Sequence, residues 1–314
     1  MKYIPFSSLI VFGALISCEK QALIEPEQHA EETFFYINAG INDAVTKAEF
    51  TTNFGLYWND NDRVGLVRQD NNSEIIVSAA ATITNEYRTA TFGIASSQLT
   101  SGVKYRPYYP EYEEGTNGGW ATDWNHAGWY VNAVQTQYSS GKLENGRFFL
   151  WGTQDIDYST ENQDVNTYFD LAGTVICFKV YGGSDDEETI SSVKIEQTND
   201  LSSTVNIVSG SYYSNDTGSS SDASRFSVTV TISGYTEYAN RDKSTANGIY
   251  AVIIPNHNYD AEAPYTRHGN TYTYTVETNK KTYTFESAKE KIYENKYIYE
   301  MPLNLSKATS TVAK

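Results

Sequence analysis

The sequence predicts an all-β protein built from two tandem antiparallel β-sandwich domains. The 314 residues include 26 Tyr and 13 Phe but only two Met, and aromatic and β-branched residues favour strands over helices. Short apolar runs follow one another at close spacing, separated by Asn- and Asp-rich turns such as 59–62 and 70–73. This spacing of strands and turns is typical of a β-sandwich. A chain of about 300 residues exceeds what one hydrophobic core usually serves, so we expect two domains.

The first 17 residues have the pattern of a cleavable lipoprotein signal. An apolar run at 4–15 follows Lys2 and is too short for a stable span, which needs about 20 residues. The next residues complete the motif Leu-Ile-Ser-Cys at 15–18, which matches a bacterial lipobox. Cleavage would make Cys18 the first residue, anchored by acyl chains such as palmitate. The alternative is an ordinary secretory signal with an incidental cysteine, but the usual small-residue cleavage site is missing.

Charge and cysteine content restrict which partners and disulfides the mature chain can have. Residues 18–30 are polar, contain a proline and predict a tether. Removing 1–17 leaves 22 basic residues against 39 acidic ones, a net charge of −17, so we expect no nucleic acid partner. If Cys18 is acylated, Cys177 has no disulfide partner. Because Cys177 lies in the apolar run 174–180, we expect it in the core.

The N-terminal domain is expected over residues 31–167. Its apolar runs are separated by turns, and a long loop at 111–130 interrupts the pattern. The runs that we expect as strands are 33–39, 48–52, 63–68, 75–84, 87–93, 103–109 and 147–152.

The loop at 111–130 holds the one concentrated group of aromatic residues. Its candidate contact residues are Trp120, Trp124, Trp129 and Tyr130. Flat aromatic faces suit stacking on sugars or contact with a protein. The alternative, which we favour, is that the tryptophans pack the loop onto its own sandwich.

The C-terminal domain is expected over residues 168–314. In the run 270–277, Tyr and Val alternate with Thr, which indicates one buried and one solvated face. We expect an exposed Ser- and Gly-rich loop at 209–224 and a short helical turn at 287–294. The expected strands are 168–181, 190–197, 204–208, 225–232, 248–255, 270–277, 281–285 and 296–305.

No motif for catalysis or metal binding is present in the sequence. There is no Gly-x-Ser-x-Gly, and the four histidines lie far apart without a paired zinc motif. The acidic clusters at 59–62 and 185–188 lack calcium-loop spacing, so we interpret both as solvated turns. A carboxylate pair for glycoside hydrolysis is a spatial arrangement that sequence does not reveal. We therefore expect a protein that is not an enzyme and has no cofactor or metal.

Several short phrases, in a shared order, resemble the fimbrillin, or type V pilin, family of outer-membrane lipoproteins. They occur along nearly the whole chain and contain strand ends and core aromatics. The phrases are Thr46-Lys47-Ala48, Trp58-x-x-x-Asp62-x-Val64-Gly65, Arg106-Pro107-Tyr108-Tyr109-Pro110, Val134-Gln135-Thr136-Gln137, the segment from Tyr250 to Pro255 and the segment from Tyr293 to Tyr299. The resemblance implies two transthyretin-like sandwiches and a lipid-anchored fimbrial subunit or adhesin of the outer membrane.

The resemblance also implies assembly by β-strand exchange with other fimbrial subunits. In stalk-forming members a trypsin-like protease cuts after a basic residue, the first strand leaves, and a partner's strand replaces it. Here the cut would fall between Lys47 and Ala48, and 33–39 would be lost. Arginine is usual at that position, so an unprocessed anchor or accessory subunit fits equally. Receptors would be a host protein or a glycan, and the alternative function is a surface glycan-binding lipoprotein that uses the loop 111–130.

Overall fold

The computed structural model describes fourteen segments of the chain, and the predicted signal and tether lie outside them. The segments are 32–42, 45–46, 56–70, 75–84, 88–109, 120–121, 127–143, 148–161, 164–198, 210–213, 227–253, 270–287, 289–294 and 296–312. Their regular structure is strand apart from two 3-10 turns, Ser96–Gln98 and Leu305–Lys307, so the all-β prediction is confirmed. No helix in these segments has the length and hydropathy required to cross a bilayer.

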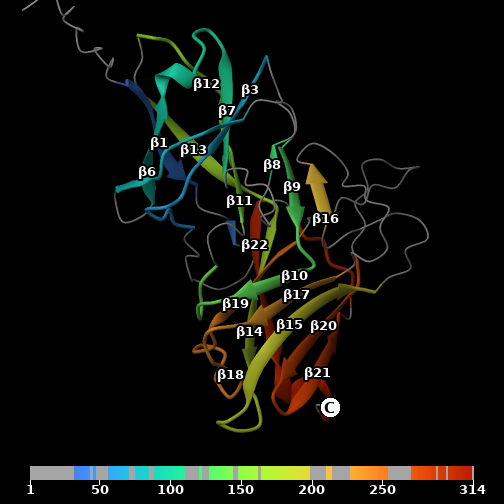
Figure 1. The fold of residues 1–314 in the computed structure, drawn as a ribbon. Helices are drawn as coiled ribbons and strands as arrows, with labels where there is room; N and C mark the ends of the chain where they lie inside the picture. Colours follow the sequence, from blue (N-terminus) through green and yellow to red (C-terminus); the bar gives the residue numbers. More distant parts are fainter. Residues whose placement is uncertain are drawn as a thin grey trace, which may run out of the picture. The chain divides into compact units, whose positions relative to one another are not determined.

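A nine-stranded sheet gathers strands from the first 172 residues (Figure 1). Its order is β4-β3-β7-β11-β13-β1-β6-β5, and β12 pairs with β7. The strands are β1 (Phe34–Ile41), β3 (Gly65–Arg68), β4 (Ile75–Val77), β5 (Thr82–Thr84), β6 (Thr89–Ala95), β7 (Lys104–Tyr109), β11 (Phe149–Gly152), β12 (Ile156–Asp157) and β13 (Asp164–Ala172). β1, the first strand in the described part of the chain, therefore lies inside the sheet rather than at an edge.

Two further sheets contain most of the later strands. One has the order β10-β17-β15-β20-β21-β23 with β18 on β15, and the other has the order β19-β14-β22-β2. Their strands are β2 (Val45–Thr46), β10 (Val134–Gln137), β14 (Thr174–Tyr181), β15 (Thr189–Gln197), β17 (Ser227–Ile232), β18 (Glu237–Tyr238), β19 (Gly248–Ile253), β20 (Tyr272–Thr278), β21 (Lys281–Glu286), β22 (Tyr297–Asn304) and β23 (Thr309–Val312). β2 and β10 come from the first half of the chain, and the predicted division near residue 167 stays a prediction.

The sheets are mixed, which differs from the expected purely antiparallel pairing. Four pairs of strands are parallel. β1 pairs with β13, and β10 pairs with β17, while β22 pairs with both β14 and β2. Parallel neighbours require long connections instead of hairpins, and apolar alternation does not distinguish the two arrangements. The single strand expected at 168–181 is divided at Gly173, whose φ of 100° ends β13 and begins β14.

Other departures concern segments rich in polar or aromatic residues. The loops expected at 111–130 and 209–224 contain strands of a small fourth sheet, β8 (Trp120–Ala121), β9 (Ala127–Val131) and β16 (Gly210–Tyr213). The helical turn expected at 287–294 is wrong in its described part, where Lys291 forms a bridge with Asn270. The runs at 48–52 and 204–208 lie outside the described residues.

The core contains the residues that the alternation in 270–277 places on the buried face, Tyr272, Tyr274 and Val276. Trp58 is fully buried, and the rings of Phe92, Tyr109 and Phe169 meet it edge-on at centroid distances of 5.0–5.4 Å, a favourable geometry for aromatic groups. Cys177 on β14 is buried as predicted. Burial raises the pKa of its thiol to about 12, so the thiolate, which is the reactive form, is scarce at neutral pH.

Two glutamines of β10 join the sheets through their side chains. The amide of Gln137 accepts from Tyr250 N at 2.9 Å and donates to Gly248 O at 3.0 Å. The amide of Gln135 accepts from Val252 N at 3.0 Å and donates to Val252 O at 2.7 Å. Among the described strands β19 lies at one edge of its sheet. These buried amides therefore hydrogen-bond the backbone groups that a neighbouring strand would otherwise pair with.

Candidate strand-exchange site

The strand that the resemblance marks as exchangeable is held on both sides. β1 pairs with β13 from Tyr36 opposite Asp164 to Ile41 opposite Phe169. It pairs with β6 from Phe34 opposite Ala95 to Gly40 opposite Thr89. Losing β1 would expose the backbone groups of two strands at once and leave a slot between them.

The inward side chains of β1 fill this slot. Phe35, Ile37, Ala39 and Ile41 are buried, and the ring of Phe35 meets that of Tyr158 edge-on at 5.3 Å. Burying the three large side chains stabilises the strand by about 5 to 9 kcal/mol at typical values per residue. A replacement strand must therefore supply apolar side chains at alternate positions.

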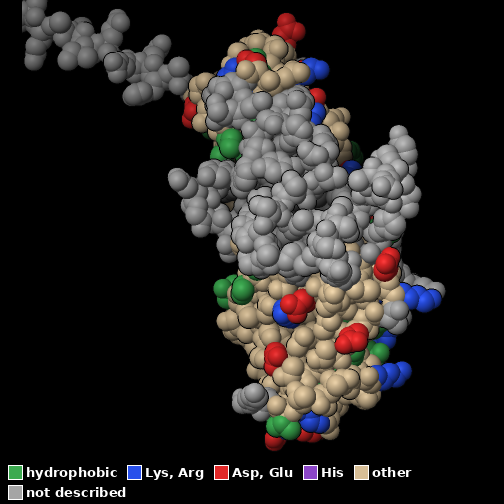
Figure 2. Space-filling model, turned by 90° about the vertical axis from the view of Figure 1, so that its right-hand side faces the viewer, with side chains coloured by type: hydrophobic (Ala, Val, Ile, Leu, Met, Phe, Trp, Pro, Cys, Tyr) green, Lys and Arg blue, Asp and Glu red, His purple; other side chains and the backbone are tan. Residues whose placement is uncertain are grey.

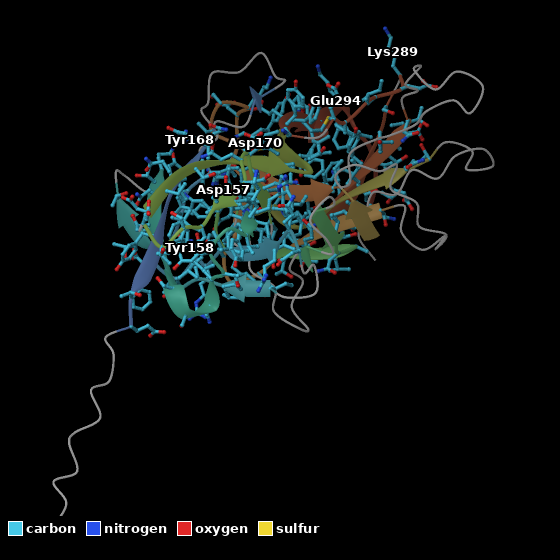
Figure 3. All side chains as sticks on the ribbon, turned by 90° about the horizontal axis from the view of Figure 1, so that it is seen from above. Asp157, Tyr158, Tyr168, Asp170, Lys289 and Glu294 are labelled. Carbon is cyan, nitrogen blue, oxygen red and sulfur yellow. The ribbon has the colours of Figure 1, made fainter. Side chains whose placement is uncertain are left out.

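A single carboxylate fixes the end of β1. Asp170 on β13 accepts from Asn42 Nδ2 at 2.7 Å and from Lys296 Nζ at 2.9 Å; Figure 3 labels Asp170 on this strand. Burial disfavours the charged form of Asp170, but the bonds from Asn42 and Lys296 outweigh it and hold the pKa below its usual value. The tie connects the residue after β1 to the residue before β22.

The chain beyond β1 reaches a second sheet before the predicted cut. Val45 and Thr46 of β2 pair in parallel with Tyr297 and Ile298 of β22. Lys47 and Ala48 follow directly but lie outside the described residues, as does the predicted lipidation site Cys18. Cleavage after Lys47 would separate β2 as well as β1 from the rest of the chain, a point that the sequence did not reveal.

The C-terminal tail forms an edge strand. β23 pairs only with β21 among the described strands, and all four of its side chains are exposed. The tail at 306–314 is mostly polar, so it offers few apolar anchors for the groove of a partner.

The predicted aromatic contact residues fall partly on the small fourth sheet. Trp120 lies on β8 opposite Gly128, and Trp129 lies on β9 opposite Tyr212 of β16. Tyr130 is the next residue of β9, and Trp124 lies outside the described residues. The structure thus brings the backbone at Trp120 and Trp129 into one sheet, whereas contact with a ligand at these residues stays a prediction. Sequence reasoning missed the pairing with β16, although the Tyr212-Tyr213 pair within a Ser- and Gly-rich stretch was a signal for it.

The two acidic clusters are structural, and the interpretation of both as solvated turns is wrong for their buried members. Glu188 is fully buried and accepts from Ser184 N at 2.8 Å, Thr278 Oγ1 at 2.9 Å and Tyr283 Oη at 2.7 Å. Burial opposes its ionisation, yet these bonds keep the pKa of Glu188 below its ordinary value. Asp62 is likewise buried and accepts from Tyr109 Oη at 3.0 Å.

In the described segments, neither the charged side chains seen in Figure 2 nor the potential metal ligands form a cluster that indicates a binding site. On the face drawn in Figure 2, acidic and basic side chains of described residues lie interspersed in small groups. The described segments contain no group of three or more His, Cys, Asp or Glu side chains arranged to hold a metal ion.

Neither a protein-family model nor a curated protein matches the chain. Among solved structures, the chain is similar to a Bacteroides ovatus protein provisionally named as a cell adhesion protein, with 15% identity, a TM-score of 0.48 and coverage of 90% of this chain and 96% of that one. A Bacteroides uniformis protein with the same provisional name has 12% identity, a TM-score of 0.45 and coverage of 89% and 97%. A fimbrial protein from Bacteroides vulgatus has 17% identity, a TM-score of 0.36 and coverage of 88% and 98%. In each of these three cases the similarity covers most of both chains.

Proposed function

We propose that the chain is a lipid-anchored, non-enzymatic fimbrial subunit or adhesin of the cell surface that joins other subunits by β-strand exchange. The observation that carries this proposal is the position of β1. It is the first strand of the described residues, it lies between β13 and β6, and it ends only a few residues before Lys47. One cut can therefore release a strand from inside a sheet without dividing any other described strand of that sheet.

The exchange follows from the chemistry of the slot. Once β1 leaves, β13 and β6 present unpaired N–H and C=O groups along a row of emptied apolar pockets. A donor strand from another subunit restores both hydrogen-bond ladders and fills the pockets of Phe35, Ile37 and Ile41. Before the cut, β1 competes for the slot as part of the same chain, so a separate donor is at a disadvantage.

Cleavage after Lys47 would decide whether the chain acts as a tethered subunit or as a polymerising one. A chain that keeps Cys18 stays tethered at the outer membrane and retains β1, which suits an anchor or a free adhesin. A chain that begins at Ala48 has lost its lipid, its tether and β1 together, which suits a polymerising subunit.

The test is the N-terminus of the protein recovered from the cell surface. Intact-mass and N-terminal analysis of monomers and of high-mass polymers should find lipidated Cys18 in the former and Ala48 in the latter. Lys47→Gln should abolish the polymers, whereas Lys20→Gln, a matched change in the tether, should not. Polymers built from chains that retain residues 18–47 would overturn strand exchange at this slot.

A further inference from the structure

The outer face of the nine-stranded sheet carries a cluster of exposed aromatic side chains. Phe34 and Tyr36 on β1 are 37% and 44% exposed, and Tyr168 on β13 is 57% exposed; Figure 3 labels Tyr168 beside Asp170 on β13. Asn38 and Asn166 lie opposite each other on the same two strands, between these rings. We call these five residues the aromatic face.

Glycines allow the rings of the aromatic face to lean on the sheet. A Cβ added at Gly93, which pairs with Tyr36, would lie 3.4 Å from Phe34 Cδ1 and 3.5 Å from Tyr36 Cε1. A Cβ at Gly40, which pairs with Tyr168, would lie 2.8 Å from the Cδ1 and Cε1 atoms of that ring. Rings held over glycine in this way are supported by backbone on one side and open to solvent on the other.

The two rings of β1 form one broad surface. The centroids of Phe34 and Tyr36 are 6.3 Å apart, and their planes differ by 31°. Two rings side by side at a shallow angle present a larger flat apolar area than either ring alone. Such a surface suits a ligand with a flat, weakly polar face.

Polar side chains between the rings are held in place and keep hydrogen-bonding capacity for a ligand. The Oδ1 atom of Asn38 accepts from Thr91 Oγ1 at 2.9 Å, which fixes the amide and leaves its Nδ2 to donate elsewhere. Within the described segments, the side-chain amide of Asn166 and the hydroxyls of Tyr36 and Tyr168 make no hydrogen bond to another residue. The aromatic face therefore offers planar amide and phenol groups to a ligand.

The charge of this region restricts the ligand. β1, β5, β6 and β13 contain no lysine or arginine, and Asp164 lies opposite Tyr36. An anionic ligand would meet Asp164 and no cation from these strands, and Lys296, which reaches β13 from outside them, is paired with Asp170. The centre of a stable protein interface is mostly apolar, whereas here two asparagines separate the rings.

We propose that the aromatic face binds a neutral oligosaccharide. The C–H faces of pyranose rings stack on Tyr36, Phe34 and Tyr168, and the sugar hydroxyls exchange hydrogen bonds with Asn38 and Asn166. None of its five residues belongs to the segment 111–130. It needs β1 in place, because three of its five residues lie on that strand, so it belongs to the uncut chain and stands whether or not strand exchange occurs.

The test is a neutral-glycan array probed with the full mature lipoprotein in detergent, with Lys47 intact. Hexasaccharides from xylan, glucan, mannan and galactan, beside sulfated and sialylated glycans, make up the array. We expect retention by at least one neutral sugar. Tyr36→Ala and Tyr168→Ala should each weaken this binding by about tenfold or more, as expected for the loss of a stacking ring.

The controls are two tyrosines of equal exposure away from this sheet, Tyr238 at 44% and Tyr138 at 57%. Tyr238→Ala and Tyr138→Ala should bind as the wild type does, and circular dichroism checks the fold of every variant. Asn166→Ala, an exposed change that keeps the rings, should also weaken binding. Failure of every neutral sugar to bind, a preference for the anionic glycans, or loss of binding on Trp129→Ala but not on Tyr36→Ala would overturn the proposal.

Discussion

The carboxylate of Asp170 accepts a hydrogen bond from Asn42 Nδ2 at 2.7 Å, and this bond closes the end of β1. The same carboxylate accepts from Lys296 Nζ at 2.9 Å. Asp170 thus links the exit of the first strand to the entry of β22, in the region where the predicted cut would act. Its surroundings give a pH-dependent prediction.

Asp170→Asn should lower the free energy of unfolding at neutral pH by about 1 kcal/mol, a value kept small because solvent screens a partly exposed ion pair. The pKa of Asp170 is lowered in the folded protein, so its stabilisation is present above the unfolded pKa near 3.8 and is lost as pH falls through the lower folded value. Thermal melts of both proteins should differ at pH 7 and converge in strong acid. A difference that persists below both pKa values would contradict this account, and Asp164→Asn serves as an exposed control on the same strand.

Ile37→Ala should loosen β1 specifically. Ile37 is fully buried, and truncating a buried isoleucine costs about 2 to 5 kcal/mol. Hydrogen exchange should quicken across 34–41 and in the paired strands β6 and β13. Tyr36→Ala removes an exposed ring from the same strand and should change stability much less, so equal effects of the two variants would contradict the burial argument.

Gln137→Leu should expose the edge of β19. Without the amide, Tyr250 N and Gly248 O lose their side-chain partners, and each unsatisfied buried group costs about 1 to 3 kcal/mol. We expect lower stability together with concentration-dependent dimers in size-exclusion chromatography, because an open edge invites strand addition. Val134→Thr changes an exposed side chain of the same strand and should remain monomeric.

Lys296→Gly should be more stable than Lys296→Ala. Lys296 has a φ of 71°, a left-handed conformation that favours glycine over other residues by about 1 kcal/mol or more. Both variants lose the bond to Asp170, so their difference isolates the backbone conformation. Chemical denaturation measures it, and a greater stability of the alanine variant would show that the left-handed turn is not maintained in solution.

Thiol titration reports on both cysteines. Cys177 is buried and the pKa of its thiol is raised to about 12, so Cys177 should not react with a thiol reagent at neutral pH in the native protein. The denatured protein should contain one reactive thiol if Cys18 is acylated and two if it is not. A native Cys177 that reacts readily would contradict its place in the core.

Local sequence determined which faces of the strands are buried. The alternation of Tyr272, Tyr274 and Val276 with threonine places these three in the core, and the apolar run around Cys177 becomes the central strand β14. Such periodicity works because successive side chains of a strand point to opposite faces. The all-β class followed from the same signal.

Only the tertiary structure decided which strand edges meet. Backbone hydrogen bonds are chemically alike along the chain, so no local pattern predicts that β1 pairs in parallel with β13, that Tyr212 of β16 lies opposite Trp129, or that Gln137 closes the edge of β19. The same holds for Glu188, whose acidic neighbours suggest a solvated turn until Tyr283 and Thr278 are brought to it. Alternation selects the buried face of each strand, whereas packing of distant segments selects its neighbours.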